Sequence, residues 1–400
     1  MSETRQTLQE FCKDRKIINT HCHHLPETFQ ASLGLDVLLR NTYVSWCGID
    51  FDQTPESKRE YLRLVRFNAY FYWLEKALKE LCDLPQELTE KTWDTFDNRI
   101  RENHKTKDYH LSILKDRCCY EKIILDPYWN PGSNEGHPEL FTPAYRINMF
   151  LFGYNTRAKD HNGNNPFKVY HWQETLTFDE YLGQMEEQII NHIQSGCVAV
   201  KSALAYDRGL DFSQATKEKA QKGYMNPRAD AEEIKAFQDY IFFEICRIAA
   251  DRNVPLQCHT GLGKLEKSNA MQMQEVIAGN PDTKFVLFHG SYPWIQDVCG
   301  LIHNYPNVYA DICWLPIISG NACETLLKEL IEVGTTNRVM WGCDTWTSEE
   351  SYGAMLAGKN VLAEVFSQYV DKGYLSQFDA QEYIDCILYK NAKKLFSHLE

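Results

Sequence analysis

The chain lacks the features of a membrane protein, a nucleic-acid-binding protein and a secreted protein. No stretch approaches the roughly 18 uncharged apolar residues that a membrane-spanning helix requires. The formal net charge of −13 argues against a nucleic-acid-binding protein, which would need a basic face. The opening segment Met1–Arg5 runs into charged sequence without the apolar core of a signal peptide. We therefore expect a soluble, cytoplasmic protein that contacts neither nucleic acid nor membrane.

Closely spaced cysteine pairs are also missing. The chain has 14 cysteines but no Cys-x-x-Cys motif. This usage fits a reducing compartment, where most thiols pack as small buried hydrophobes. No internal repeat and no Pro/Gly/Ser-rich linker divides the 400 residues. The sequence therefore predicts one domain over residues 1–400.

What recurs along the chain is a short apolar run, a polar turn and a helix-like segment. The runs are continuous rather than alternating, as in parallel strands that are buried on both faces. Eight of them, interleaved with amphipathic helices, predict an α/β fold of the (β/α)₈ (TIM) barrel type. No Gly-rich loop follows a run, which argues against an open dinucleotide-binding sheet. The predicted strands are Ile17–Asn19, Lys122–Leu125, Ile147–Gly153, Val198–Ser202, Val254–His259, Lys284–His289, Val308–Ile312 and Arg338–Cys343, and the clearest helices are Ala231–Arg252, Ala270–Ile277, Cys323–Val333 and Tyr352–Tyr369.

A long helical segment, residues 25–115, separates the first two predicted strands. Thr54 and Pro55 have the residue types of an N-cap and a first helical position. The helix predicted to start there has a wide apolar face, formed by Leu62, Val65, Phe67, Tyr70, Trp73, Leu74 and Leu78. An insertion after strand one emerges at the C-terminal face of a barrel, where active sites lie. We expect a helical cap over the site; an independent helical domain is an equally supported alternative.

His21 and His23 follow the first apolar run. Their two-residue spacing on an extended strand points both imidazoles to the same side. His24 then points to the other side, and Cys22, which also faces away, is expected to be structural. By itself the His-x-His motif is a weak signal, because many such pairs serve packing.

Three further polar residues each end a separate predicted strand. His259, His289 and Asp344 stand at the C-terminal ends of strands five, six and eight, which is where catalytic residues occur in such barrels. Imidazoles with a carboxylate suit Zn²⁺ or a similar divalent ion and leave a position open for water. The sequence therefore predicts a metal site; a purely structural metal is the minor alternative, which would make the chain a non-catalytic metal-binding barrel.

Lys201 closes the fourth strand after three apolar residues. One interpretation is a lysine that reaches outward or pairs with an acid. The other places it inside the barrel mouth, where it bridges two metals as a carbamate or binds an anionic substrate as an ammonium.

Together these residues resemble the amidohydrolase superfamily. The resemblance rests on His21-Cys22-His23, Lys201, His259, His289 and Asp344 on strands one, four, five, six and eight. Within the superfamily, the segments Cys258–Gly263, Phe288–Trp294 and Leu388–Phe396 are similar to the amidohydrolase-2 group, which includes the amidohydrolase-like domain fused to glutamine synthetase. The long first insertion is the least informative part of the resemblance.

The resemblance implies a role for each site residue. His21 and His23 hold the more buried metal beside Asp344, which also acts as general base. A carboxylated Lys201 bridges to a second metal held by His259 and His289. With an unmodified Lys201, His259 joins the first site and His289 contacts water or substrate and takes part in catalysis. Zn²⁺ is the expected metal, in one or two copies, with Mn²⁺ and Fe²⁺ as alternatives.

Candidate substrate-binding residues lie just beyond the strand ends. Arg208 is suited to a substrate carboxylate, although a salt bridge with Asp207 or Asp211 explains it nearly as well. Asp311, which ends strand seven, is expected to orient a ligand histidine. The full substrate-binding set comprises Tyr206, Arg208, Ser291, Tyr292 and Trp314.

The function predicted from the sequence is that of a metal-dependent hydrolase. Its substrate is a small, carboxylate-bearing amide or ester, cleaved by metal-activated water at a C–N or C–O bond. A metal-dependent decarboxylase or a uronate-isomerase-like enzyme on the same barrel is the alternative, because fold does not determine chemistry. A homo-oligomer is compatible with the sequence.

Overall fold

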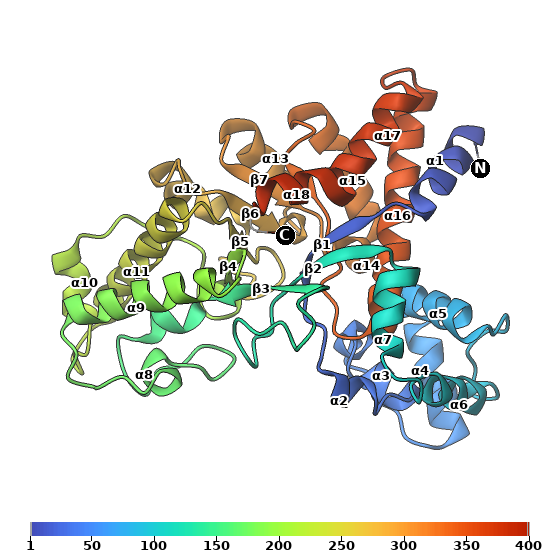
Figure 1. The fold of residues 1–400 in the computed structure, drawn as a ribbon, viewed down its shortest axis with the longest axis horizontal. Coiled ribbons are helices and arrows are strands. Elements are labelled where there is room, and N and C mark those ends of the chain that lie inside the picture. The colour runs from blue at the N-terminus through green and yellow to red at the C-terminus, as the bar shows by residue number, and fades with distance from the viewer. Residues whose placement is uncertain (1, 398, 400) are drawn as a thin grey trace.

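Eight parallel strands form a single ring-like sheet at the centre of the molecule (Figure 1). The structure is a computed structural model and describes residues 2–397 and 399. Each strand pairs in parallel with the next one along the chain. The strands are β1 (Ile17–Cys22), β2 (Tyr120–Leu125), β3 (Phe141–Arg146), β4 (Ala199–Ser202), β5 (Leu256–Cys258), β6 (Phe285–Phe288), β7 (Val308–Asp311) and β8 (Val339–Met340).

The first and last strands meet through backbone and side-chain hydrogen bonds. The amide of Asp344 donates to the carbonyl of His21 at 2.9 Å. The side-chain oxygen of Asn19 accepts from the amide of Cys343 at 2.9 Å. These bonds bring β1 beside β8 and confirm the predicted (β/α)₈ barrel.

One predicted strand is wrong. The apolar run Ile147–Gly153 contains a buried 3₁₀ helix, η3 (Asn148–Phe152), and the third strand is the preceding segment, β3. Apolar continuity indicates burial but does not distinguish a buried strand from a buried helical turn. Asn148 also favours the turn, because its side chain accepts from the amide of Ala203 at 2.8 Å and donates to Asp207 at 2.7 Å.

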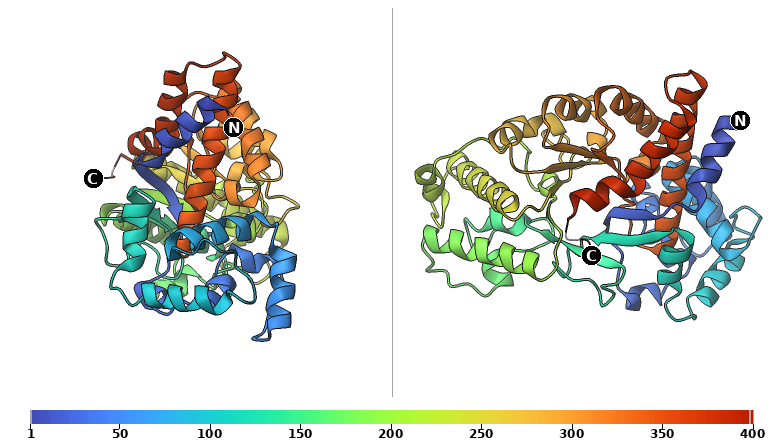
Figure 2. Two further views of the ribbon diagram at one scale, coloured as in Figure 1. Left: turned by 90° about the vertical axis from the view of Figure 1, so that its right-hand side faces the viewer. Right: turned by 45° about the horizontal axis from the view of Figure 1, so that its top comes forward.

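Helices surround the sheet and pack their apolar faces against it (Figure 2). Capping boxes begin three of them, with Thr177 and Glu180 at α9, Asp230 and Glu233 at α11, and Ser376 and Asp379 at α17. The four helices expected between the later strands are present; the segment Ala270–Ile277 divides into η5 (Ala270–Met273) and α12 (Gln274–Gly279). The others outside the insertion are α1 (Glu3–Lys13), α8 (Pro166–Val169), α9 (Phe178–Gln194), η4 (Leu204–Tyr206), α10 (Lys217–Gly223), α11 (Ala231–Asp251), η6 (His289–Ser291), α13 (Ile295–Asn304), α14 (Leu315–Ile318), α15 (Gly320–Val333), α16 (Ser348–Asp371), α17 (Gln377–Asp385), η7 (Cys386–Lys390) and α18 (Asn391–Leu395).

The insertion between β1 and β2 is helical and has an apolar cluster of its own. As predicted, Thr54 caps α4, and its hydroxyl accepts from the amide of Ser57. The single long helix expected after it is wrong, because α4 ends at Val65 and Asn68 caps a new helix, α5. Phe67 lies in the break and is 96% exposed instead of part of an apolar face. The elements are α2 (Glu27–Gln30), α3 (Leu35–Arg40), η1 (Tyr43–Cys47), α4 (Pro55–Val65), α5 (Ala69–Cys82), α6 (Trp93–Asn103), α7 (Tyr109–Ser112) and η2 (Ile113–Arg117).

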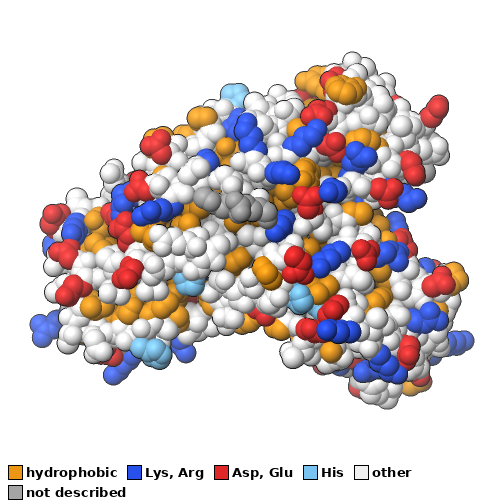
Figure 3. Space-filling model, viewed as in Figure 1, with side chains coloured by type: hydrophobic (Ala, Val, Ile, Leu, Met, Phe, Trp, Pro, Cys, Tyr) orange, Lys and Arg blue, Asp and Glu red, His pale blue; other side chains and the backbone are white. Residues whose placement is uncertain are grey.

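The insertion forms a lobe at one side of the barrel, and its α5 packs along α16 (Figures 1 and 2). Lys and Arg side chains are interspersed with Asp and Glu over the face seen in Figure 3. Within residues 2–397 and 399, no helix combines the length and the apolar character needed to cross a membrane.

Candidate metal centre and its cavity

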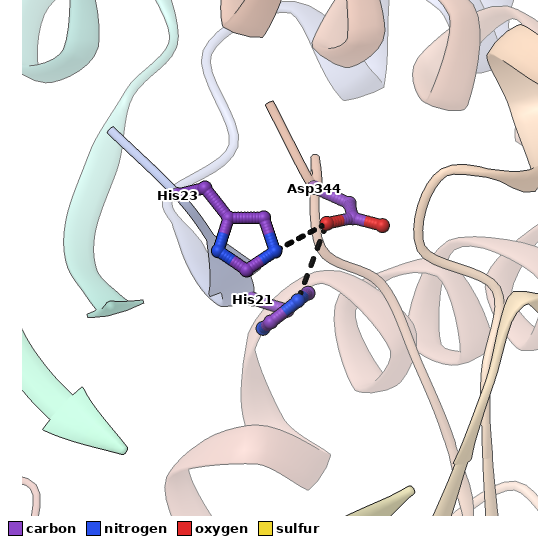
Figure 4. A group of neighbouring side chains, drawn as sticks. All are labelled: His21, His23 and Asp344. Carbon is purple, nitrogen blue, oxygen red and sulfur yellow. Dashed lines mark ion pairs between the residues drawn. The ribbon is translucent and has the colours of Figure 1, made fainter. Parts of the chain in front are cut away.

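The ends of β1 and β8 bring three of the predicted ligands together (Figure 4). The Nε2 atoms of His21 and His23 lie 3.2 Å and 3.3 Å from Oδ1 of Asp344. All three side chains are buried. Because β1 is extended, the imidazoles two residues apart point to the same side of the strand.

The ends of β5 and β6 complete the group. Nε2 of His289 lies 3.6 Å from Oδ2 of Asp344 and 3.0 Å from Nδ1 of His259. The structure therefore brings His21, His23, His259, His289 and Asp344 into one buried cluster.

Hydrogen bonds on the outer side of each ring determine which nitrogen faces the centre. Nδ1 of His23 donates to the carbonyl of Asp126 at 2.8 Å, Nε2 of His259 donates to that of Leu262 at 2.5 Å, and Nδ1 of His289 donates to that of Cys313 at 3.0 Å. A carbonyl only accepts, so in each neutral ring the other nitrogen presents a lone pair to the centre.

Burial keeps the rings neutral, and the neighbouring histidines keep the carboxylate charged. Burial lowers the pKa of His21 to about 3 and that of His289 to about 4, and it lowers the pKa of His259 well below its usual range. Burial alone would raise the pKa of Asp344, but the neighbouring histidines outweigh it and hold that pKa well below its ordinary value. These are the protonation states that metal ligation requires.

This donor set fits a divalent metal ion. Lone pairs of His259 and His289 face each other at 3.0 Å, and a third, from His23, faces a carboxylate oxygen. Facing lone pairs repel unless a cation lies between them, and imidazole with carboxylate is a typical ligand set for Zn²⁺ and related ions.

Several site residues have strained backbone. His289, Trp314 and Asp344 have φ values of 64°, 60° and 56°. For residues with side chains this left-handed region costs of order 1 kcal/mol or more and recurs at functional sites. The strain aims these side chains inward from the strand ends.

A cavity of about 230 Å³ opens above the cluster. The small volume suits a small molecule rather than a polymer. Its wall combines cationic or polar groups with aromatic rings. The lining residues are His21, His23, Tyr43, Trp46, Tyr128, Arg146, His161, Asn162, Lys201, Ala203, Tyr206, His259, Asp344 and Trp346.

Lys201 reaches this cavity from β4. Its side chain is buried, and Nζ lies 3.8 Å from the centre of the Phe288 ring. Among the described residues Nζ has no hydrogen-bond partner. Burial lowers its pKa to about 8, so the amine is poised between its charged and neutral forms.

The predicted substrate-binding residues separate into two groups. Tyr206 lines the cavity, with its ring 4.4 Å from that of His259, and Trp314 lies behind the lining, 5.2 Å from the ring of His289. Among the described residues, the other three do not line this cavity, and their part in substrate binding stays a prediction. Arg208 pairs with Asp239 at 2.8 Å. The Ser291 hydroxyl accepts from a backbone amide, and Tyr292 lies outside the lining.

Asp311 does not touch a ligand histidine. It accepts from the hydroxyl of Thr20 and from the amide of Cys313. The group that orients His289 is the carbonyl of Cys313. His24 and Cys22 face away as expected; Nε2 of His24 lies 2.8 Å from Nδ1 of His110, and the Cys22 thiol donates to the carbonyl of Thr345.

Sequence reasoning missed much of the opposite wall. Arg146 ends β3 and forms a buried ion pair with Asp126, which itself follows β2. The strand-end rule would have found Asp126, and it missed Arg146 because the third strand was misplaced. His161 and Asn162 lie on a long loop, where the sequence carries no periodic signal.

The Cys313 thiol lies 3.3 Å from Nδ1 of His289 and was also missed. With His289 and Asp344 it forms a second group of atoms close enough to share a metal. Burial raises the pKa of this thiol well above its usual range, which favours the neutral form over a thiolate ligand.

Comparison with known proteins supports a metal site at the barrel mouth. Residues 218–397 match the sequence model of a family described as amidohydrolase, of the amidohydrolase-2 group. Protein FluG of Emericella nidulans is 31% identical over 223 residues, which cover 50% of this chain and 25% of FluG. The chain therefore resembles the amidohydrolase superfamily over residues 218–397. Enzymes of this superfamily depend on metal ions, in keeping with the cluster at the barrel mouth.

Solved structures share the fold of this chain over nearly its whole length. The uronate isomerase of Thermotoga maritima aligns with a TM-score of 0.76 at 16% identity, over 99% of this chain and 98% of its own. The glucuronate isomerase of Caulobacter crescentus also aligns with a TM-score of 0.76 at 16% identity, over 99% and 94%. At this identity the likeness establishes the fold alone. The region aligned with FluG spans only a quarter of that relative.

Proposed function

We propose that this protein is a metal-dependent hydrolase of the amidohydrolase superfamily that cleaves the C–N or C–O bond of a small, carboxylate-bearing amide or ester. The observation that carries the proposal is the convergence of imidazole lone pairs on Asp344 at the base of a small cavity. Such a cluster at a barrel mouth suits chemistry, whereas structural zinc sites are closed and rich in cysteine.

His21, His23 and Asp344 would hold the metal, with His259 and His289 completing the set. Zn²⁺ is proposed, with Mn²⁺ and Fe²⁺ as alternatives. When bound, the ion lowers the pKa of a coordinated water and polarises the scissile carbonyl. Oδ2 of Asp344 faces away from His21 and His23 and lies near His289. That oxygen is placed to accept a proton from the attacking water and return it to the leaving group.

Lys201 has two proposed states. Below its pKa of about 8 the buried ammonium is suited to a substrate carboxylate. As a carbamate it would instead bridge to a second metal near His259 and His289. Elemental analysis, together with mass spectrometry of the peptide containing Lys201, distinguishes these states: one metal with a free amine, or two metals with a carboxylated lysine.

The test is a screen of metal-loaded protein against N-acyl amino acids, γ-glutamyl amides, lactones and uronic acids. We expect hydrolysis of at least one amide or ester. Asp344→Asn should lower that activity by at least about 100-fold, and His303→Ala, at an exposed position on α13, should leave it unchanged. Full activity in Asp344→Asn, or a purified protein that binds no metal, overturns the proposal.

Isomerisation of a uronate is the second candidate. Two uronate isomerases share the fold over 99% of this chain, which includes the insertion. In the same screen it would appear as conversion of an aldose to a ketose without bond cleavage. Release of CO₂ would instead identify a decarboxylase.

We also propose that the enzyme acts in the cytoplasm as a single-domain barrel with the insertion, residues 25–115, as its cap. All 14 cysteines are free thiols, which suits a reducing compartment. Its partner is a small-molecule substrate, in line with the size of the cavity and the acidic net charge. Assembly into a homo-oligomer is compatible with this proposal.

A further inference from the structure

Four aromatic rings from distant parts of the chain pack together at one side of the cavity mouth, where three of them line the cavity and Trp314 lies behind them. Tyr43 and Trp46 come from η1 in the insertion, Trp346 follows β8, and Trp314 follows β7. The Tyr43 ring lies 4.6 Å from both the Trp314 and the Trp346 rings, and the Trp46 ring lies 5.5 Å from that of Trp314. We call these four residues the aromatic wall.

The aromatic wall is unevenly buried. Tyr43 and Trp314 are almost completely covered, at 3% and 1% exposed, but Trp46 is 52% exposed. Burying an indole face is strongly favourable, and aromatic rings prefer an offset or edge-on ring as partner. Because Trp46 lines the catalytic cavity, its uncovered face is open to whatever fills that cavity.

The wall stands directly beside the metal centre. The Trp346 ring stacks against that of His23, with centroids 5.8 Å apart and planes at 23°. A flat group resting on Trp46 and Trp346 would therefore adjoin the reacting carbonyl. Lys201 and Arg146 line the same cavity, so the unpartnered Lys201 ammonium is available for an anionic group. The positive charge of Lys201 also disfavours a cationic group as the partner of the indole.

The wall is held in place by protein contacts alone. Glu350, buried in the first turn of α16, accepts from the amide of Tyr43 at 2.6 Å and from that of Trp346 at 3.2 Å. One carboxyl group thus ties the insertion to the loop after β8. Because this subsite is already ordered, the protein loses little conformational entropy when a ligand binds there.

We propose that the aromatic wall is a stacking subsite, and that the substrate carries a planar aromatic ring next to its scissile carbonyl, with its carboxylate toward Lys201. This inference rests on the proposed function for the location of the carbonyl. A cavity of about 230 Å³ accommodates one ring and a short acidic chain. The insertion therefore contributes to substrate selection.

The test uses two ketones without a hydrolysable bond. 3-Benzoylpropionate and levulinate share the ketone and the carboxylate. The ketone of 3-benzoylpropionate carries a phenyl ring, whereas that of levulinate carries a methyl group. Their affinities for the metal-loaded full-length protein are measured by isothermal titration calorimetry. Since neither is cleaved, this result is separate from the screen for hydrolysis.

We expect 3-benzoylpropionate to bind at least about tenfold more tightly than levulinate. Trp46→Ala should reduce that ratio to less than about threefold with little change for levulinate, and Trp46→Phe should keep most of it. Tyr72→Ala is the matched control, because Tyr72 is also 52% exposed and lies elsewhere in the insertion. Equal binding of the two ketones, no binding of either, or an unchanged ratio in Trp46→Ala overturns the inference.

Discussion

At the scale of single residues, the carboxyl group of Glu350 is the least ordinary feature outside the metal cluster. It is buried, and it accepts hydrogen bonds from the backbone amides of Tyr43 and Trp346. Burial raises its pKa from the ordinary value of 4.5 to about 8 in spite of these two bonds. At neutral pH the folded protein therefore holds a proton on Glu350 that the unfolded chain has released.

This makes the stability of the protein depend on pH in a defined direction. The contribution of Glu350 is fully present below 4.5 and is lost as pH rises toward 8, because the unfolded state binds fewer protons over that interval. Glu350→Gln removes the titration. We expect the free energy of unfolding of the wild type, minus that of the variant, to fall by about 3 kcal/mol between about pH 5 and about pH 8. Urea denaturation at several pH values measures this difference, and a constant difference would contradict the prediction.

At the scale of secondary structure, the contact of α5 with α16 fixes the insertion against the barrel. Gly353 on α16 lies under the backbone of Trp73 on α5. A Cβ atom at this glycine would stand 2.8 Å from the carbonyl oxygen of Trp73 and 3.1 Å from its carbonyl carbon. Since the obstacle is backbone, the two helices must move apart to admit a side chain.

Gly353→Ala should therefore destabilise the protein by about 1–3 kcal/mol, although alanine is the better helix former. Gly183→Ala in α9 is the matched control, because none of the described atoms outside its own helix and neighbours lies within 4 Å of the added Cβ. The control should gain up to about 1 kcal/mol. Chemical denaturation measures the change in the free energy of unfolding of both variants. A change of the same sign in both would contradict the prediction and show that α5 moves away from α16 at little cost.

At the scale of the whole molecule, the proposed metal ligands come from the two ends of the barrel. His21 lies in β1, His23 directly follows it, and Asp344 follows β8, more than 300 positions later in the chain. A bound ion would therefore hold the first and last strands together. An ion that binds only the folded state stabilises it by mass action, by about 2.7 kcal/mol at 100 times its dissociation constant.

Removing the metal with a chelator should lower the melting temperature, and adding Zn²⁺ should restore it. His23→Ala should melt at the same temperature with and without chelator, whereas His303→Ala should respond like the wild type. Differential scanning calorimetry with parallel metal analysis measures both effects. A melting temperature insensitive to the chelator, in protein shown to have lost its metal, would contradict the idea that the ion joins the strands.

A site residue could be predicted from the sequence when the pattern that marks it lies in neighbouring residues. His259, His289 and Asp344 could be found because each ends an apolar run, and parallel strands bring such ends to one face. Arg146 was missed because a buried 3₁₀ turn has the same apolar signature as a strand. Arg208 was assigned to substrate because its pairing with Asp239 joins residues 31 positions apart in sequence.

The sequence by itself determined the barrel, the amidohydrolase resemblance and the candidate ligands, since periodicity and strand ends are properties of neighbouring residues. Only the tertiary structure decided which walls enclose those ligands. Trp46 lies beside Trp314, and Glu350 holds Tyr43 to Trp346, through contacts across hundreds of positions. Such contacts depend on how the insertion packs on the barrel, and local sequence does not encode that packing.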